Sequence, residues 1–164
     1  MDKLPVQPGT YALILELVHP RRLLAGRLGE HHLPEGIYVY LGSARGPGGL
    51  RARLGHHFSG RGRLHWHIDY LRSMAQVRGW AYFVTAAGLH PPVPTECEWS
   101  LFLAGLPGAI IPVPKFGASD CRAGCPAHLV HFSRTDFWEG IYPFMDPSAG
   151  KQGLEMFIPG PHRL

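Results

Sequence analysis

The chain has 164 residues and a formal net charge of +4, with 16 Lys and Arg against 12 Asp and Glu, and its sequence pI is about 9.2. This length suits one domain with a sizeable core, and two domains are not expected. No apolar segment reaches the ~18 residues of a membrane span, and the N-terminal residues lack the apolar region of a signal peptide, so we expect a cytoplasmic protein without a membrane partner.

Three β-strands are predicted in the first part of the chain. Residues 10–18 form an almost uninterrupted apolar run between Pro8-Gly9 and His19-Pro20, which is typical of a central strand. Residues 22–28 predict a weaker strand, and residues 36–41 predict a strong one. Because side chains alternate between the two faces of a strand, Tyr38 and Tyr40 should share one face.

Helices and strands are predicted in the middle of the chain after a glycine-rich loop at 42–49. Residues 50–58 predict a helix on which Arg53 and His57, four positions apart, are neighbours on one face. Residues 68–75 predict a second helix, 77–85 a strand, 95–104 a third helix and 128–132 a last strand. Thr95 suits the N-cap of the third helix, with Glu98 as its capping-box partner.

The residues after 132 hold aromatic side chains without clear periodicity. We therefore interpret 1–132 as one domain and 133–164 as an extended arm that packs on this domain or on a partner subunit. The second arrangement would make the protein a homodimer. Disorder is the alternative for the last dozen residues.

Basic and histidine side chains are concentrated in one stretch of the sequence. Arginine outnumbers lysine 13 to 3, and the planar guanidinium suits phosphate oxygens. The stretch predicts a polyanionic partner, with a solvated basic face as the alternative. The predicted nucleic-acid-binding side chains are Arg45, Arg51, Arg61, Arg63, His65 and His67.

Three cysteines and one histidine form a candidate metal site. An odd number of cysteines without a secretory signal favours reduced thiols or metal ligation over a disulfide framework. Cys97, Cys121, Cys125 and His128 would give the Cys₃His set of a structural zinc site. The alternatives are buried thiols that pack as small apolar residues and, less favoured, a cysteine nucleophile.

Five further residues form an ordered series along the chain. A strand tyrosine in Gly9-Thr10-Tyr11 is followed by a second in Tyr40-Leu41-Gly42, then by Arg53 and His57 on a helix, and then by Glu96 on a later helix. In this order they resemble the active site of the GIY-YIG nucleases. Each piece is common alone, but the series supplies the groups that metal-assisted phosphodiester hydrolysis needs.

Within that superfamily the chain is most similar to the Uri-type branch, a group also found fused to archaeal DNA-repair glycosylases. The likeness rests on four separated motifs: GIYVYLGSA from Gly36, HWHIDY from His65, Thr95-Glu96-Cys97, and the segment from Gly117 through Cys121 and Cys125 to Leu129. They cover most of residues 9–132, which the resemblance makes a nuclease domain.

The resemblance implies a mechanism for these residues. A water near Tyr11 attacks the phosphate, Arg53 neutralises the developing charge, and Tyr40 and His57 position the water or the phosphate. One Mg²⁺ or Mn²⁺ is held by the helix glutamate, for which Glu96 is favoured over Glu98 because Glu98 already serves the helix cap.

The chain departs from the family pattern in three places. Tyr11 and Tyr40 are further apart than a single short hairpin allows, so an extra strand is expected between them. Gly36-Ile37-Tyr38 spells the first motif but lies on the same strand as Tyr40, and it cannot supply a neighbouring strand. The chain has no asparagine to match the family's late one, and Asp120 or Ser119 is expected in its place.

The sequence therefore predicts an α/β (α+β) fold: a single domain with a small mixed or antiparallel sheet flanked by helices. Its expected function is that of a divalent-metal-dependent endonuclease acting on DNA, in repair or processing. The rival interpretations are a non-catalytic nucleic-acid-binding module on the same scaffold and a zinc-stabilised interaction domain.

Overall fold

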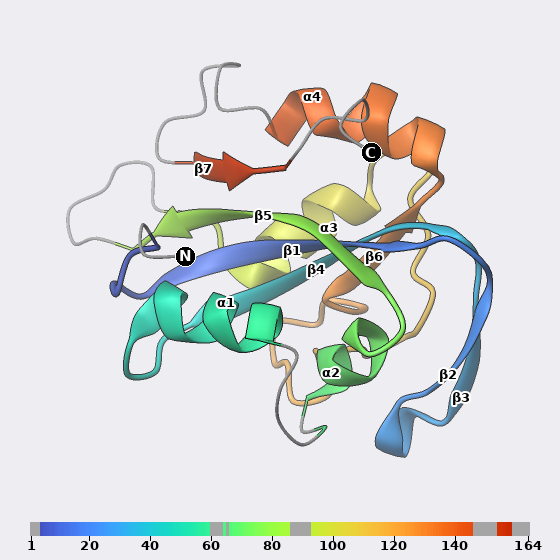
Figure 1. Cartoon of the computed structure of the whole chain (residues 1–164), viewed down its shortest axis with the longest axis horizontal. Helices are drawn as coiled ribbons and strands as arrows, with labels where there is room; N and C mark the ends of the chain where they lie inside the picture. The colour runs from blue at the N-terminus through green and yellow to red at the C-terminus, as the bar shows by residue number, and fades with distance from the viewer. Residues whose placement is uncertain (1–3, 60–63, 65, 86–92, 146–153, 159–164) are drawn as a thin grey trace.

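A five-stranded antiparallel sheet is the centre of the protein (Figure 1). The computed structural model describes residues 4–59, 64, 66–85, 93–145 and 154–158. The strands lie in the order β6-β4-β1-β5-β7. Their bounds are β1 Gly9–Leu17, β4 Gly36–Ala44, β5 Gln76–Val84, β6 Leu129–Phe132 and β7 Leu154–Phe157. The predicted fold class, a small sheet flanked by helices in one domain, is confirmed.

Strand β1 is the central strand, as its apolar run predicts, and all nine of its residues are buried. It pairs with β4 on one side and with β5 on the other, and Tyr11 lies opposite Gly42 while Leu13 lies opposite Tyr40. Tyr11 and Tyr40 therefore stand on adjacent strands and on the same face of the sheet. Tyr38, the tyrosine of the duplicate motif, is on β4 itself.

The insertion between β1 and β4 is a hairpin of two strands. β2 (Arg21–Leu24) pairs with β3 (Glu30–Leu33) in a separate small sheet, with a short 3₁₀ helix, η1 (Gly26–Leu28), between them. The predicted single strand over 22–28 is thus wrong beyond Leu24. Gly26 and Gly29 have φ values of 53° and 82°, which turn the chain back on itself.

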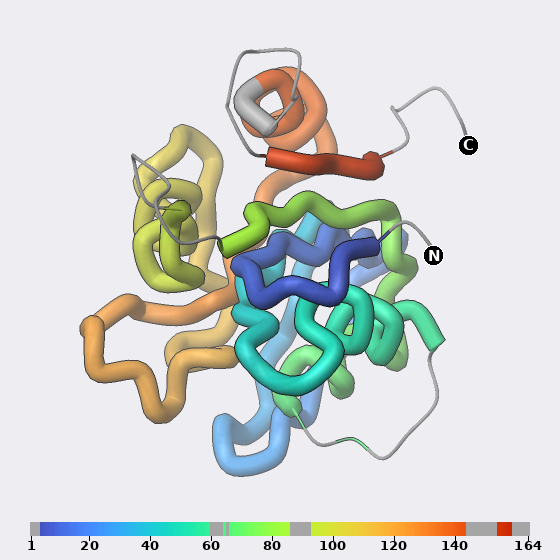
Figure 2. The backbone as a smooth tube through the Cα atoms, turned by 90° about the vertical axis from the view of Figure 1, so that its left-hand side faces the viewer, coloured from blue at the N-terminus to red at the C-terminus, as the bar shows by residue number. Residues whose placement is uncertain are grey.

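Helices cover both faces of the central sheet (Figure 2). On one face α1 (Gly49–Ser59) and α2 (His67–Arg72) bury Leu50, Leu54, Ile68 and Leu71 against the side of β1 that carries Tyr11. On the other face α3 (Glu96–Ala104) and η2 (Asp136–Ile141) bury Trp99, Leu103, Phe137 and Ile141. No helix within the described part of the chain is long and apolar enough to cross a membrane.

Helix α3 begins as its sequence predicts. Thr95 is its N-cap: the Thr95 Oγ1 accepts a hydrogen bond from the backbone N–H of Glu98, and the Glu98 carboxylate accepts one from the backbone N–H of Thr95 at 2.8 Å. This reciprocal pair fixes the first turn of α3. Glu96 and Cys97 are therefore presented from a well-defined helix start.

The segment after β6 differs from the predicted extended arm. Residues 136–145 are helical, as η2 followed by α4 (Tyr142–Met145), because Phe137 and Ile141 are four apart and both enter the core. Strand β7 is extended, but it pairs with β5 of the same chain. The disorder alternative is wrong for β7, and residues 159–164 lie outside the described residues.

Candidate active site

A cleft of about 460 Å³ opens where β4, α1, the start of α3 and the loop at 117–128 meet. Strand β6 pairs with β4 only as far as Tyr40, and the last contact is the hydrogen bond from the Leu41 N–H to the His128 carbonyl oxygen. Beyond this point side chains from both faces of the sheet reach the same space. The structure brings all the predicted catalytic residues to this cleft: Tyr11, Tyr40, Arg53, His57 and Glu96.

Tyr11 and His57 form a buried pair at the bottom of the cleft. The Tyr11 hydroxyl and the His57 Nε2 share a hydrogen bond of 2.8 Å, and His57 is 1% exposed. Burial and the nearby Tyr40 raise the pKa of Tyr11 well above its usual value. Burial, followed by the nearby His56, lowers the pKa of His57 to about 3. At neutral pH the pair is therefore a protonated phenol facing a neutral imidazole.

Two glycines make room for the tyrosines. A Cβ atom at Gly42 would lie 2.5 Å from the ring and hydroxyl of Tyr11, so only glycine lets this ring lie across β4. Gly117 has a φ of 71°, and a Cβ there would lie 2.9 Å from the Tyr40 ring. The Tyr40 ring lies 6.4 Å from that of Tyr11, and burial raises the pKa of Tyr40 to about 12. Gly42, the last residue of Tyr40-Leu41-Gly42, is therefore required for the packing of the Tyr11 ring.

Glu96 faces the cleft from the first turn of α3. Its Oε1 accepts a hydrogen bond from the Ser43 hydroxyl at 3.1 Å, and its Oε2 lies 3.5 Å from the Arg45 Nη2. The Oε2 atom is buried and has no hydrogen-bond partner among the described residues. Glu98 is exposed, does not line the cleft and serves the helix cap. One oxygen of Glu96 is therefore held in place, and the other is directed at the cleft.

Arg53 reaches the cleft from α1, whereas Glu96 reaches it from α3. Its guanidinium carbon lies 4.3 Å from the centre of the Trp66 ring, a cation–π contact. Stacking on a flat ring restricts the long side chain without neutralising its charge. Arg53 and His57 share one side of α1, as their spacing predicts.

Three of the predicted nucleic-acid-binding residues, Arg45, Arg51 and His67, are described by the structure, and their contacts differ. Arg45 lines the cleft. Arg51 donates a hydrogen bond from its Nε to the Leu4 carbonyl oxygen and is not among the cleft residues. His67 accepts a hydrogen bond on its Nδ1 from the Gly117 N–H, so it positions the loop that borders the cleft. Arg61, Arg63 and His65 lie outside the described residues.

Asp69 is buried at the start of α2. The Asp69 Oδ2 accepts a hydrogen bond from the Trp66 N–H at the start of α2, and its Oδ1 lies 3.3 Å from the His56 Nε2. Asp69 therefore caps the first turn of α2 and contacts a histidine of α1. Asp120 lines the cleft, and Ser119 is not among the described residues that do.

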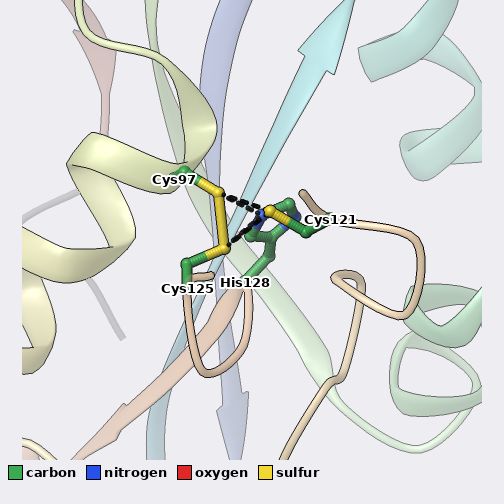
Figure 3. A group of neighbouring side chains, drawn as sticks. All are labelled: Cys97, Cys121, Cys125 and His128. Atoms are coloured by element: carbon green, nitrogen blue, oxygen red, sulfur yellow. Dashed lines mark hydrogen bonds between the residues drawn. A yellow bond between two sulfur atoms is a disulfide. The ribbon is translucent and has the colours of Figure 1, made fainter. Parts of the chain in front are cut away.

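Cys97, Cys121, Cys125 and His128 form one group of neighbouring side chains (Figure 3). Three of them, Cys97, Cys121 and His128, line the cleft together with Glu96. Their ligand atoms all lie within 4.8 Å of one another. Cys97 and Cys125 are joined as a disulfide, and the Cys121 Sγ lies 2.9 Å from the Cys97 Sγ and 3.2 Å from the Cys125 Sγ. The His128 Nε2 lies 3.2 Å from the Cys125 Sγ. The group has the ligand types and the closeness that a metal ion requires.

Two residues of the site were not predicted from the sequence. Ser43, which holds Glu96, directly follows the second motif, and the alternation of side chains along β4 puts it on the α3 face. Trp66, which stacks on Arg53, belongs to the aromatic cluster before α2, and an exposed tryptophan next to a basic helix is the signal that points to it.

The fold and the cleft define a class: a helix-flanked antiparallel sheet with tyrosine, arginine, histidine and glutamate around one opening. The model of the family described as Domain of unknown function DUF123 matches residues 10–146, and the chain belongs to this family. No curated protein and no solved structure matches the chain.

Proposed function

We propose that this protein is a divalent-metal-dependent endonuclease that hydrolyses phosphodiester bonds in DNA, with the Uri-type GIY-YIG nucleases as its nearest likeness and DNA repair or processing as its role. One observation carries the proposal. Side chains from β1, β4, α1 and α3, in the order that resembles those nucleases, surround a single cleft. The groups are a proton-transfer pair, a cation and a carboxylate, which phosphodiester hydrolysis uses together.

The Tyr11–His57 pair supplies proton transfer in this proposal. A phenol with a raised pKa is not itself a phenolate at neutral pH, whereas the neutral imidazole beside it can accept a proton. As water attacks the phosphorus, its proton passes to the Tyr11 oxygen while the Tyr11 proton passes to the His57 Nε2. Burial keeps His57 neutral over the whole physiological pH range, and the negative phosphate that binds beside it would favour its protonated form when it accepts the proton.

Arg53 and Tyr40 act on the phosphate. The guanidinium of Arg53 neutralises the charge that develops on the non-bridging oxygens, and the protonated Tyr40 hydroxyl donates a hydrogen bond to the phosphate. Trp66 restricts Arg53 before substrate arrives, so less side-chain entropy is lost when the phosphate binds.

Glu96 fits the single Mg²⁺ or Mn²⁺ that the resemblance implies. Its buried Oε2 has no hydrogen-bond partner within the described part of the chain, and Ser43 fixes the other oxygen. Mg²⁺ is commonly held by one or two carboxylates together with water and substrate oxygens. When bound, such an ion would polarise the phosphate and stabilise the leaving oxygen.

We also propose that the group of Cys97, Cys121, Cys125 and His128 holds a structural zinc ion when its thiols are reduced. Tetrahedral zinc with bonds of roughly 2.0–2.3 Å places its ligand atoms roughly 3.5 Å apart, and the four ligand atoms here already lie within 4.8 Å of one another. A disulfide engages two of the four side chains, whereas zinc engages all of them.

A second candidate function is a non-catalytic nucleic-acid-binding module. The chain has no asparagine, and the Arg45 Nη2 lies 3.5 Å from the Glu96 oxygen that would bind the metal. An arginine in this position compensates the carboxylate charge without any ion.

A panel of labelled substrates decides between the two functions. Single-stranded, fully paired, nicked, flapped and branched DNA, with matched RNA, are incubated with the full chain with and without Mn²⁺. Cleavage of any DNA that requires Mn²⁺ supports the endonuclease. Binding without cleavage under every condition supports the binding module, and cleavage of RNA alone corrects the substrate.

A further inference from the structure

A second hollow, of about 240 Å³, adjoins the cleft on the α1 side. It shares Arg53 and Trp66 with the cleft, so the two are continuous around the guanidinium that is proposed to bind the phosphate. Its remaining lining residues are Ala44, Gly46, Pro47, Gly49, Ala52 and His56. Small side chains thus form one side of the hollow and aromatic rings the other.

The aromatic side is built around a buried carboxylate. Asp69 is 1% exposed; its Oδ2 accepts a hydrogen bond from the Trp66 N–H at 3.0 Å, and its Oδ1 lies 3.3 Å from the His56 Nε2. The two rings meet edge to face, with centres 5.0 Å apart. One buried anchor therefore fixes both rings, while Trp66 remains 38% exposed.

A metal ion is a poorer explanation of these residues. His56, His57 and Asp69 lie close enough together to be tested as ligands. However, the two Asp69 oxygens are engaged by His56 and by the backbone at the start of α2, and the His57 Nε2 by Tyr11. Among these three residues only the His57 Nδ1 is a buried atom without a hydrogen-bond partner in the described part of the chain, and one such atom does not make a metal site. The arrangement holds rings in place around a space instead of directing ligand atoms into it.

We propose that this hollow receives one nucleobase next to the phosphate that is cut, so that the preferred substrate is DNA with an unpaired nucleotide. The inference rests on the proposed function. Arg53 in the shared wall places the phosphate, and the neighbouring nucleoside then lies beside Trp66 and His56. Aromatic rings bind every base through its π-face, and Arg53 and Arg45 complement the backbone charge.

Pairing would keep a base out of this hollow. A base inside a duplex is stacked on both sides, and it reaches a pocket beside the strand only when it is extruded. A bulged, mismatched or single-stranded nucleotide avoids most of that cost. The hollow therefore selects for structure in the DNA and only weakly for sequence.

The test measures binding of the full chain, without added Mg²⁺ or Mn²⁺ and without chelator, to three oligonucleotides that carry 2-aminopurine: a single strand, a duplex with one bulged nucleotide, and a fully paired duplex. We expect the first two to bind at least about tenfold more tightly than the third, with quenching of the fluorescence by stacking. Trp66→Ala should weaken binding of the unpaired forms by about 5- to 50-fold. Duplex binding should weaken clearly less, because a duplex loses only the restriction of Arg53. Trp66→Phe should retain most of the preference.

Two further variants keep the test decisive. Ala52→Leu fills the hollow from an exposed position of α1, where a substitution does not threaten folding, and it should also remove the preference for unpaired nucleotides. Phe102→Ala changes an exposed aromatic ring on α3, which does not line the hollow, and should have no effect. Equal weakening of all three ligands, or no preference in the unaltered protein, overturns the inference.

Failure of this inference is separable from failure of the proposed function. Cleavage in Mn²⁺ that does not favour unpaired nucleotides overturns the base site and leaves the nuclease standing. A Trp66-dependent binding preference without cleavage in any metal overturns the nuclease and leaves the base site as a property of a binding module.

Discussion

The two walls of the cleft are held together in different ways. The tyrosine wall, formed by Tyr11, Tyr40, Arg53 and His57, stands on β1, β4 and α1 and belongs to the larger network of apolar side chains on that face of the sheet. The cysteine wall, formed by Glu96, Cys97, Cys121, Cys125 and His128, comes from the first turn of α3 and from a loop. Around its cysteines the buried apolar group contains only Cys97, Ala118 and Cys125, with Cys121 packed against it.

This difference indicates where each wall gets its rigidity. Burial of apolar area stabilises the tyrosine wall, because its strands and helix share one core. The cysteine wall has little apolar area of its own, so the contacts among its thiols and His128 must fix the loop and, through Cys97, the residue next to Glu96. The proposed ion at the cysteine wall should matter most for stability, and the proposed ion at Glu96 for catalysis.

The largest expected effect is loss of zinc from the cysteine wall. In reducing buffer we expect elemental analysis to find one zinc per chain. A strong chelator should lower the melting temperature by more than about 10 °C, because the free energy of binding a structural zinc contributes to the stability of the fold. Cys125→Ser should do the same without chelator. Ser119→Ala, at an exposed position of the same loop, is the control.

A different outcome would favour the disulfide over zinc. If the reduced protein contains no zinc and only reductant lowers its melting temperature, the Cys97–Cys125 bond is what stabilises this wall. The cysteine wall would still depend on its cysteines and not on apolar burial, but a covalent bond would stabilise it in place of an ion.

Glu96→Gln should have the next largest effect, and on activity alone. The amide keeps the shape and can still contact Ser43, but it is a poor metal ligand, so Mn²⁺-dependent cleavage should fall by about 10³-fold or more. Melting temperature and DNA affinity should stay near those of the unaltered protein. Loss of stability comparable with that of Cys125→Ser would mean that Glu96 belongs to the structural site instead.

Tyr11→Phe tests the proton-transfer pair of the tyrosine wall. Without the hydroxyl, cleavage should fall by about 10²-fold or more, and the buried His57 Nε2 loses its partner, at a cost of about 1–3 kcal/mol in stability. Tyr38→Phe is a matched control, because the Tyr38 hydroxyl donates to the Pro34 carbonyl oxygen away from the cleft. Similar activity in both variants would remove Tyr11 from the mechanism.

His57 should also make the tyrosine wall sensitive to acid. Its pKa is about 3 in the folded protein and about 6.5 in the unfolded chain, so the unfolded chain binds the proton first as the pH falls. Its contribution to stability is complete above pH 6.5 and is lost as the pH falls from about 6.5 toward 3, by at most roughly 1.4 kcal/mol per pH unit.

The measurement is the free energy of unfolding at pH 7 and at pH 5, where most carboxylates remain charged. Between these two values His57→Gln should lose about 2 kcal/mol less than the unaltered protein. His32→Gln, at an exposed position of β3, should not change the dependence. An identical pH dependence in all three proteins would mean that His57 is not held neutral.

Local patterns in the sequence place the side chains of the tyrosine wall, whereas the four cysteine and histidine side chains of the cysteine wall are predicted from residue type alone. Strand alternation and a four-residue helical spacing place Tyr40, Arg53 and His57, since these depend on neighbours along the chain. The contact of Ser43 with Glu96 requires β6 to begin only at Leu129 and α3 to pack there, which no local pattern encodes. The hydrogen bond from Arg51 to the Leu4 carbonyl oxygen is likewise a tertiary contact.

The same reason explains the two wrong secondary-structure predictions. Residues 22–28 have one apolar pattern, but the turn at Gly26 divides them between β2 and a 3₁₀ helix. Phe137 and Ile141 are spaced as neighbours on a helix, but this spacing predicts a helix only when both are known to be core residues. Long-range packing decides both cases.

The smallest expected effect is that of Glu98→Gln, and it separates the two glutamates at the start of α3. Glu98 is exposed, and hydrogen bonds from the backbone N–H and the hydroxyl of Thr95 lower the pKa of its carboxyl. Glutamine can also complete a capping box but has no charge to interact with the helix dipole, so the melting temperature should fall by about 1–3 °C. Cleavage should be unchanged, because side chains two positions apart on a helix point in nearly opposite directions and only Glu96 faces the cleft.

Loss of activity in Glu98→Gln with activity retained in Glu96→Gln would reassign the metal ligand. Activity retained in both variants would place the metal away from α3 and leave the cysteine wall with a purely structural role.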